Sequence, residues 1–443
     1  MYEFKKTDSK ELEKTITILL AVLMIAMPLG HSLQLLKIIQ TERMSITEVI
    51  LTVGALILLM FDGAYVFRKE NRKLRTLDIV AVLMLFSVVI STLLSWDMGL
   101  AMGGNDVTGE NAFVMASYVI VFYSASIVKD RRNKKIIYAA SVILGLIQFC
   151  FTVFQTVFVL DIFEAPLAAM GARAFGTIRN PNPFASLMVV LAGIECGLFY
   201  NSKRKNQYIL HGILIVLYAF SMFASGTRGA FVGFFAAALI MSILLIIKEK
   251  KSKRSLYQAF GKLGIIIILL AVSAGLCFLP SQNSWQTVAE RTSTDVQNGE
   301  FGQFRGKMWA DSIERYFLKS PIFGCGPSNI NFGCFTGSVE DDSFHGEIIG
   351  DVHNKYLNIL NTQGAVGLLA YLILLGMCVV KCYKKFIMEN QESDGSALGM
   401  ILAFIGFIIS DFFCIGMACM VPYFYILLGI MCGREETKCL SKK

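Results

Sequence analysis

Three side chains in the carboxyl-terminal half of the sequence are suited to acid–base and anion chemistry. His353 lies in the stretch DVHNKYLNILNTQGAVGLLAYL, two residues after Asp351. A histidine titrates near neutral pH, so it is the natural general base for a hydroxyl nucleophile. Arg228, in SGTRGAFVG, and Arg305, in FRGKMWADSI, have permanent charge and can pair with phosphate oxygens through two N–H groups. These residue types predict chemistry on a hydroxyl group and an anion.

Each of these residues also has a purely structural interpretation. His353 could be an interfacial histidine that bonds to a loop, and Asp351 could be the base with His353 as donor. Arg228 sits in a connector between two apolar runs, where an arginine can extend its charge to the membrane surface. The glycines on either side of Arg228 expose backbone amides, so the same position suits an anion-binding site equally well. For His31, His211 and His345 we expect no catalytic role.

Two further polar segments adjoin apolar runs. Asp351 is a candidate N-cap for a helix that starts at Val352, with Asn354 in its first turn. In GTIRNPNPFAS (176–186), Arg179 is followed by two Asn-Pro steps, at Asn180 and Asn182. The residue before a proline is disfavoured in a helix, so this segment predicts a stiff turn before the next helix.

The elements that position these groups are membrane helices. The chain has 443 residues, 55% of them hydrophobic and only 17% charged, with a mean hydropathy of +0.59. A membrane span needs roughly 20 mostly apolar residues, and backbone groups in lipid must bond internally. The sequence therefore predicts an all-α, polytopic membrane protein with about 12 transmembrane helices. The expected spans are 15–36, 46–67, 79–95, 112–128, 136–160, 184–200, 208–224, 230–247, 263–279, 365–381, 397–413 and 415–432.

Charge predicts the orientation of these spans. With the N-terminus inside, 30 of the 41 lysines and arginines fall in the seven inner segments, whereas loop 96–111 has none. Basic residues prefer cytoplasmic loops, so both termini are expected on the cytoplasmic side of the membrane. The net charge of +8 then reflects topology, and nucleic acid is not an expected partner. The first run is too long for a cleavable signal peptide and lacks a small-residue cleavage site.

The chain is expected to form one membrane domain (1–443) with one large extracytoplasmic loop (280–363) between the ninth and tenth spans. Long loops in compact chains are usually functional. Within this loop, residues 304–320 have the apolar spacing of an amphipathic helix, and PIFGCGPSN (321–329) predicts a turn. Cys325 and Cys334 share the loop and could form a disulfide. No Cys/His spacing typical of a metal site occurs.

These segments resemble one known family. HNKYLNILNTQGAVG (353–367) is similar to the carboxyl-terminal signature of the O-antigen ligase and Wzy-type polysaccharide polymerase superfamily. That signature is a His, then Asn, Ser or Gln, nine residues, Gly, two residues, and Gly, Thr or Tyr; His353, Asn354, Gly364 and Gly367 fit it without departure. SGTRGAFVG resembles the family's Ser/Thr-Arg-Gly segment, with Val232 where Leu is usual. Two further parts of the sequence resemble other elements of this family: NPNPFAS, and FRGKMWADSI followed by PIFGCGPSN.

The resemblance implies a GT-C-like membrane glycosyltransferase that needs no metal or other cofactor. Such an enzyme takes a glycan linked to undecaprenyl diphosphate. It transfers this glycan to an acceptor sugar hydroxyl at the outer face of the bacterial plasma (inner) membrane. His353 would orient or deprotonate that hydroxyl, while Arg228 and Arg305 would stabilise the departing diphosphate. The expected substrate-binding residues are Arg179, Asn180, Asn182, Asn354 and Asp351.

Within this family, a polymerase adds the chain to the next lipid-linked repeat unit, whereas a ligase uses a different acceptor. The motifs are shared, and we favour a polymerase because polymerases are the more numerous members. The expected partners are the undecaprenyl-diphosphate-linked oligosaccharide, membrane lipid and other polysaccharide-assembly proteins. A flippase for lipid-linked oligosaccharides is the competing class. It should have charged residues within its spans, whereas here the polar groups gather at one face.

Overall fold

The fold is that of a helical membrane protein, as the sequence predicts. The computed structural model describes residues 2–35, 45–67, 75–104, 109–158, 172–251, 256–280, 284–297, 305–331, 350–388 and 396–433. Within these ranges the regular elements are all helices, and each of the twelve predicted runs overlaps one of them. Nine of the described helices are long and apolar enough to cross a membrane, and three apolar helices (α5, α14 and α15) are shorter.

The helices follow one another along the chain, and the two longest connections lie between α6 and α7 and between α12 and α13. Their bounds are α1 Tyr2–Leu35, α2 Ile46–Phe67, α3 Thr76–Leu93, α4 Met98–Gly103, α5 Ala112–Ala125, α6 Arg131–Thr156, α7 Pro181–Asn201, α8 Lys205–Ala224, α9 Arg228–Lys251, α10 Leu256–Leu276, α11 Ser284–Gln297, α12 Arg305–Arg315, the 3-10 turn η2 Phe317–Lys319, α13 Lys355–Met388, α14 Ser396–Asp411 and α15 Val421–Cys432.

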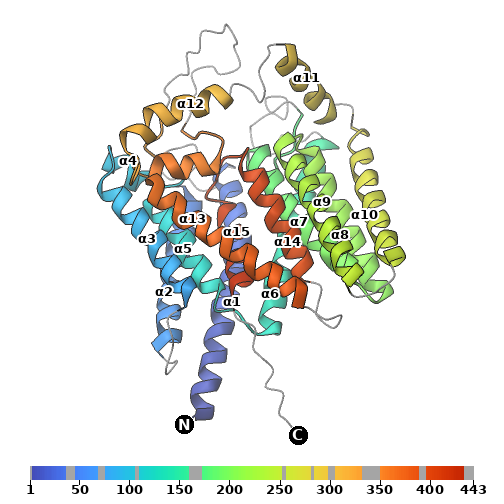
Figure 1. The fold of residues 1–443 in the computed structure, drawn as a ribbon, viewed down its shortest axis with the longest axis horizontal. Coiled ribbons are helices and arrows are strands. Elements are labelled where there is room, and N and C mark those ends of the chain that lie inside the picture. The colour runs from blue at the N-terminus through green and yellow to red at the C-terminus, as the bar shows by residue number, and fades with distance from the viewer. Residues whose placement is uncertain are drawn as a thin grey trace.

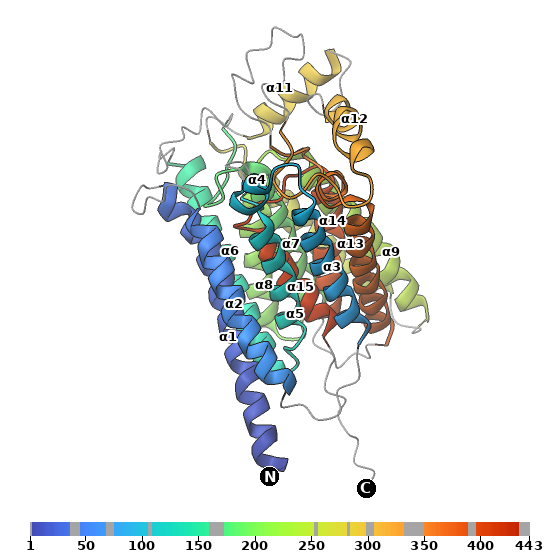
Figure 2. The same ribbon diagram turned by 90° about the vertical axis from the view of Figure 1, so that its left-hand side faces the viewer.

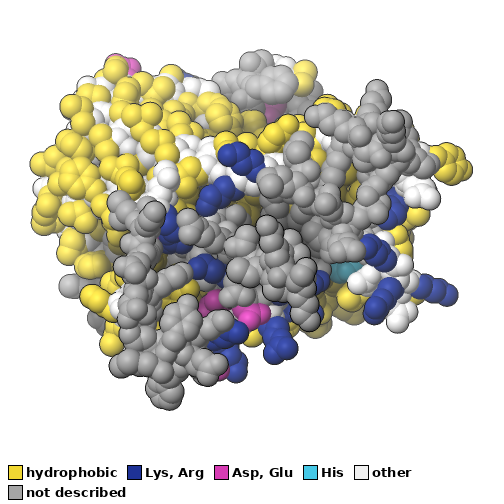
Figure 3. All heavy atoms as spheres, turned by 60° about the horizontal axis from the view of Figure 1, so that its bottom comes forward, with side chains coloured by type: hydrophobic (Ala, Val, Ile, Leu, Met, Phe, Trp, Pro, Cys, Tyr) yellow, Lys and Arg dark blue, Asp and Glu magenta, His cyan; other side chains and the backbone are white. Residues whose placement is uncertain are grey.

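The long helices form one bundle whose two ends differ. Helix α1 begins at the end we call the terminal end, and α11 and α12 cover the opposite end, which we call the α12 end (Figures 1 and 2). Lys and Arg side chains gather at the terminal end, beside a broad hydrophobic flank (Figure 3). Exposed basic residues of this end include Arg131, Arg132, Lys203, Arg204 and Lys205. This polarity agrees with the predicted cytoplasmic location of the termini, which stays a prediction.

Close helix packing at the centre of the bundle depends on small residues. A Cβ added to Gly197 of α7 would lie 2.1 Å from the backbone nitrogen of Gly399 in α14, and one added to Gly193 would lie 2.8 Å from that of Ala403. Small residues four apart let membrane helices approach closely, where van der Waals contact replaces the missing hydrophobic drive. Helix α7 is therefore a buried central helix rather than a lipid-facing one, with 89% of its span buried.

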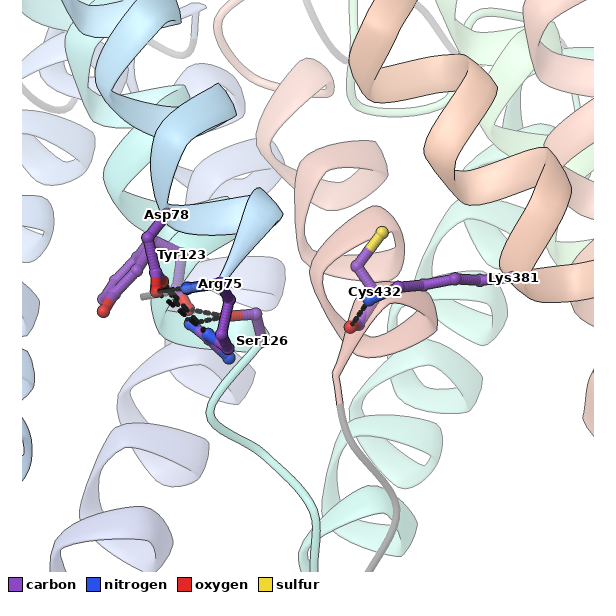
Figure 4. A network of polar contacts seen from close by, with 6 residues as sticks. All are labelled: Arg75, Asp78, Tyr123, Ser126, Lys381 and Cys432. Carbon is purple, nitrogen blue, oxygen red and sulfur yellow. Dashed lines mark hydrogen bonds and ion pairs between the residues drawn. The ribbon is translucent and has the colours of Figure 1, made fainter. Parts of the chain in front are cut away.

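Polar contacts fix the helix ends at the terminal end (Figure 4). Arg75, just before α3, donates to the Asp78 carboxylate at 2.7 and 3.0 Å and lies 5.6 Å from the ring centre of Tyr123. The ammonium group of Lys381 in α13 donates to the carbonyl of Cys432, the last residue of α15. A cation at a helix C-terminus satisfies an otherwise unpaired carbonyl and complements the helix dipole.

His211, in the first half of α8, forms a contact between helices. Its Nδ1 is 2.7 Å from a carboxylate oxygen of Glu195 in α7, which also accepts a 3.0 Å bond from the Tyr138 hydroxyl of α6. Glu195 is buried, so these two partners compensate its removal from water. The contact is structural, in keeping with the expectation of no catalytic role for His211. The His31 side chain and His345 lie outside the described residues.

Three predicted boundaries are wrong. The last span does not start at residue 415, because residues 412–420 form a non-helical connection and α15 begins at Val421. The amphipathic helix of the long loop ends at Arg315 and is followed by η2. The helix near His353 does not start at Val352 with Asp351 as cap: it starts at Lys355, and Asn354 accepts bonds from the amides of Tyr356 and Leu357.

A sharp break at Gly364 divides α13 into a short segment, 355–363, and a long one, 365–388. Gly364 has φ 68° and ψ −169°, a region of backbone space that is essentially restricted to glycine. The turn 321–326 packs into the break: Cys325 and Gly326 donate to the carbonyls of Asn361 and Thr362, and the amides of Ala365 and Val366 donate to carbonyls of that turn. The backbone groups that the break frees are thus paired.

We predict that Gly364→Ala destabilises the protein. A Cβ there would lie 2.2 Å from the Ile322 carbonyl oxygen, and the positive φ alone costs on the order of 1–3 kcal/mol. Thermal unfolding in detergent should show a clearly lower midpoint. The matched control is Gly376→Ala in the same helix, where a Cβ meets nothing within 4 Å and stability should hold or rise. Equal midpoints for the two variants would contradict this account of the motif glycine.

Candidate functional site

Arg228 lies where the turn between α8 and α9 meets α11. It is the first residue of α9, directly after Gly226, whose φ is 58°, and Thr227. Its guanidinium makes a 2.7 Å ion pair with Asp295 of α11 and a 3.4 Å contact with the Thr292 hydroxyl. Arg228 is thus paired with a charged group of α11, while part of its side chain stays exposed.

A second arginine, Arg173, forms a cluster with Arg228 at this turn, and the sequence interpretation missed it. It is buried, and its guanidinium donates to the Ser225 carbonyl at 2.7 Å, the Asn182 side-chain oxygen at 2.8 Å and the Thr227 hydroxyl at 2.9 Å. All three acceptors are uncharged, so none of them neutralises the charge of the guanidinium. One sequence signal existed: Arg173 lies seven residues before Asn180 in the same segment as the Asn-Pro steps.

The two asparagines of the Asn-Pro-Asn element have distinct structural positions. Asn180 is the N-cap of α7, and its side chain accepts a bond from the amide of Asn182. The Asn182 side chain instead faces Arg173. Arg179, the residue before this cap, has φ 63° and an exposed side chain. It takes no part in the hydrogen bonds described above for Arg173 and Asn182.

Arg305 connects the cluster to the histidine. As the first residue of α12, it donates to the Phe413 carbonyl, at 2.9 Å, in the connection between α14 and α15. Helix α12 is held over the bundle by Trp309, whose indole N–H donates to the Val352 carbonyl at 2.9 Å and whose ring packs edge-on against Phe412. The amphipathic face predicted for this segment thus caps the bundle and contacts the residue that precedes His353.

His353 is held in a strained backbone conformation. Its φ is 54°, which is uncommon for a residue other than glycine and is frequent at functional sites. One Asp351 carboxylate oxygen accepts from the His353 amide at 2.6 Å, and Nδ1 of the ring lies 3.4 Å from the Asp351 carbonyl oxygen. If Nδ1 carries the proton toward that carbonyl, Nε2 is the atom left to accept a proton. The His353 ring is half-buried, whereas Asp351 is 1% exposed.

Burial and charge together keep His353 neutral. Burial, followed by the positive charge of Arg305, lowers the pKa of His353 to about 4. The pKa of the Asp351 carboxyl moves the other way, to about 8, because it is buried and close to the charge of Glu110. The imidazole is therefore neutral at pH 7, and the ring nitrogen without a proton has a free lone pair that can accept a hydrogen bond from a hydroxyl.

Four arginines repel one another across this site. Burial, and then the charges of Arg291, Arg305 and Arg228, lower the pKa of Arg173 to about 9. Burial and neighbouring arginines also lower the pKa values of Arg291 and Arg305, and Asp295 opposes the shift in both. Like charges are held this close only at a cost, which an anionic ligand would relieve. The arrangement is therefore suited to binding an anion of more than one charge.

Two residues after His353, Lys355 forms a buried ion pair with Glu110. The Lys355 ammonium lies 2.6 and 2.7 Å from the two carboxylate oxygens of Glu110, and both residues are almost fully buried. Glu110 also accepts from the Tyr118 hydroxyl, and its carbonyl accepts from Ser328. The pair joins the start of α13 to the segment before α5 and to the 325–329 turn.

Two further expectations for the loop concern a disulfide and a metal site. Cys325 is a buried, free cysteine, and Cys334 lies outside the described residues. In the part of the chain that the structure describes, no group of three or more His, Cys, Asp or Glu side chains is arranged to hold a metal ion. The expectation that the chemistry needs no metal or other cofactor stays a prediction.

Comparison with known proteins agrees with the motifs. Residues 213–372, which include Arg228, Arg305 and His353, match the family described as O-Antigen ligase. The chain is also similar to the teichuronic acid biosynthesis protein TuaE of Bacillus subtilis (strain 168), with 24% identity over 237 residues. That alignment covers 52% of this chain and 46% of the relative, so the chain spans about half the relative's length. Both findings support the O-antigen ligase and Wzy-type superfamily, and the predicted resemblance is confirmed.

We predict that Lys355→Met alone lowers the free energy of unfolding by about 3–5 kcal/mol, because it leaves the Glu110 carboxylate buried without its cation. The double variant Glu110→Gln/Lys355→Met should recover much of this loss. Thermal unfolding of the detergent-solubilised chain provides the comparison.

The control for this prediction is Arg315→Gln, which removes an exposed ion pair with Asp311 at 3.7 Å. Such pairs contribute roughly 0–1 kcal/mol, so this variant should unfold close to the wild-type midpoint. A Lys355→Met variant as stable as the control would show that the buried pair does not hold the site together.

Proposed function

We propose that this chain, whose residues 213–372 match the O-antigen ligase family, is a membrane glycosyltransferase of polysaccharide assembly. Its donor is a glycan linked to undecaprenyl diphosphate, and its acceptor is a sugar hydroxyl at the outer face of the plasma membrane. Among the two family activities we favour the polymerase, in which the acceptor belongs to the next lipid-linked repeat unit.

The observation that carries the proposal is a set of contacts that brings arginines together at one end of the bundle. Arg173 bonds to Thr227, next to Arg228, and Arg305 bonds to the carbonyl of Phe413, which packs against Gly229 on the other side of Arg228. Arg291 lies in α11, the helix that pairs with Arg228, and its charge acts on Arg173. A lipid diphosphate is a multiply charged leaving group, and arginine pairs with it through two parallel N–H bonds. Stabilising the charge that develops as it departs is worth about 2.7–4 kcal/mol for one well-placed donor in other enzymes. The cluster supplies several such donors.

In the proposed reaction, Nε2 of His353 accepts the proton of the acceptor hydroxyl. The hydroxyl oxygen forms a bond to the anomeric carbon while the bond from that carbon to the diphosphate oxygen breaks. The electron pair of the broken bond leaves on the diphosphate, beside Arg228 and Arg305. In-line attack predicts inversion at the anomeric carbon. His353 suits the base role better than Asp351, because His353 is only partly buried, whereas Asp351 is almost fully buried and bonds to the His353 amide.

The residues around these groups have supporting roles in the proposal. Asn182 orients Arg173, and Asn180 sets the start of α7. Asn354 caps the helix that follows His353, and Asp351 fixes the His353 backbone. We retain these four as residues that shape the substrate site. Arg179 is exposed, so we propose it for the glycan or the lipid headgroup region rather than for the diphosphate.

The decisive experiment is reconstitution of the purified full chain in liposomes with one lipid-diphosphate-linked repeat unit. A ladder of longer products from this donor alone supports the polymerase. Product that forms only after a different acceptor is added supports a ligase. Absence of glycan transfer under both conditions, with movement of the donor between leaflets, would support the flippase instead.

In this assay, we expect His353→Ala and Arg228→Ala to insert normally and to lose transfer by at least about a hundredfold, as removal of a general base or a charge-stabilising donor does elsewhere. Arg228→Lys should also be poor, because a lysine cannot make the paired contact with phosphate. The control, Arg315→Gln on the exposed side of α12, should keep wild-type activity. Normal polymer length in both alanine variants would refute the catalytic roles.

The pH dependence of transfer tests His353 separately. The base must be neutral to act, and its pKa is lowered to about 4, so kcat/KM should stay constant from pH 7 down to about 5. It should then fall as pH drops through about 4. Reversibility, checked by returning samples to pH 7, separates protonation from unfolding. An acid limb near 6.5, the ordinary histidine value, would show that the ring is not held as the geometry indicates.

A further inference from the structure

Helix α11 lies against the arginine cluster and is attached at its N-terminal end. The Ser284 hydroxyl donates to the Phe223 carbonyl at 2.8 Å, and the Trp285 indole donates to the Ala274 carbonyl at 3.1 Å. The Trp285 ring stacks on Phe278 at 5.8 Å between ring centres. These contacts join the beginning of α11 to the ends of α8 and α10.

At its other end, α11 contacts the cluster through Asp295. Its carboxylate lies 2.7 Å from the Arg228 guanidinium, with side-chain exposures of 11% and 34%. Side chains 292–294, 296 and 297 are exposed, whereas Asp295 is buried and Arg291, one turn earlier, is partly buried. Asp295 and Arg291 are therefore on the side of the helix that faces the cluster. The negative charge of Asp295 also acts on Arg291 and Arg305.

We propose that Asp295 is an internal counter-ion that occupies Arg228 when the donor site is empty and yields it to the diphosphate of the donor. This inference rests on the proposed function and deepens it. Asp295 acts through Arg228 and does not touch the reacting atoms, so it is a positioning residue. Its role is to set the affinity of the site for diphosphates and to help the product leave.

The charge balance explains why such a residue is useful. When the bond from the anomeric carbon to the diphosphate breaks, the freed oxygen adds one negative charge to the lipid diphosphate. The product is thus a stronger ligand for four arginines than the donor is, and strong product binding slows turnover. A carboxylate that competes for Arg228 weakens both complexes. It thereby exchanges some donor affinity for faster release.

The test measures donor KM, kcat and inhibition by inorganic pyrophosphate on the full chain in liposomes. We expect Asp295→Asn to lower both KM and the inhibition constant of pyrophosphate by about three- to tenfold, the scale of one partly exposed ion pair. The same variant should lower kcat, because the product leaves more slowly. A merely structural loss would lower kcat and leave KM unchanged or raise it.

Two matched variants complete the experiment. Asp295→Glu keeps the charge and should restore values close to wild type, whereas Glu290→Gln removes an exposed carboxylate of the same helix and should change neither constant. If pyrophosphate inhibits wild type and Asp295→Asn equally, with equal KM, the counter-ion role is overturned and the proposed function stands. If pyrophosphate does not inhibit wild type at all, the diphosphate site itself is refuted, and this inference falls with it.

Discussion

The buried ion pair between Lys355 and Glu110 is the contact on which the α12 end of the bundle depends. Removing two charges from water is expensive, and the cost is met only when the pair is close and its other bonds are satisfied. Here both carboxylate oxygens reach the ammonium within 2.7 Å, and Tyr118 adds a bond. The pair joins the start of α13 to the segment before α5, which is far away in the sequence. His353 stands two residues before Lys355, so its position follows from this contact.

A second constraint acts beside the first, through repulsion. Arg173, Arg228, Arg291 and Arg305 come from four different segments, and burial together with mutual repulsion lowers the pKa of three of them. Repulsive arrangements of this kind persist only where the fold enforces them. Here α7, α9 and α12 begin close together at one end of the bundle, near the short connection after α14. Their positive N-terminal dipoles add to the same potential.

The two constraints meet at His353. The ion pair and Asp351 fix its backbone, and Arg305 and burial keep its ring neutral. The Gly364 break has a related effect, because it turns residues 355–363 away from the long segment of α13 and lets the 321–326 turn pack against them. The motif from His353 to Gly364 is thus a structural unit as well as a chemical one. Its glycine has a steric reason that is independent of catalysis.

The sequence by itself determined the class of the protein and most of its elements. Apolar runs of span length must become helices in lipid, so all twelve predicted runs overlap helices. Motif spacing selected His353, Arg228 and Arg305 as candidate site residues, and their catalytic roles stay predictions. Boundaries at 352 and 415 were wrong because caps and connections depend on bonds that a hydropathy pattern does not contain.

Only the tertiary structure decided which distant residues share one site. Arg173 and Arg291 carry no recognisable spacing to His353, and Lys355 finds Glu110 across 245 residues of chain. The Asp295 contact with Arg228 is equally invisible in the sequence. These are contacts between helices, set by how the bundle packs through residues such as Gly197 and Gly399. A one-dimensional pattern records which faces are apolar, whereas packing fixes which polar groups those faces bring together.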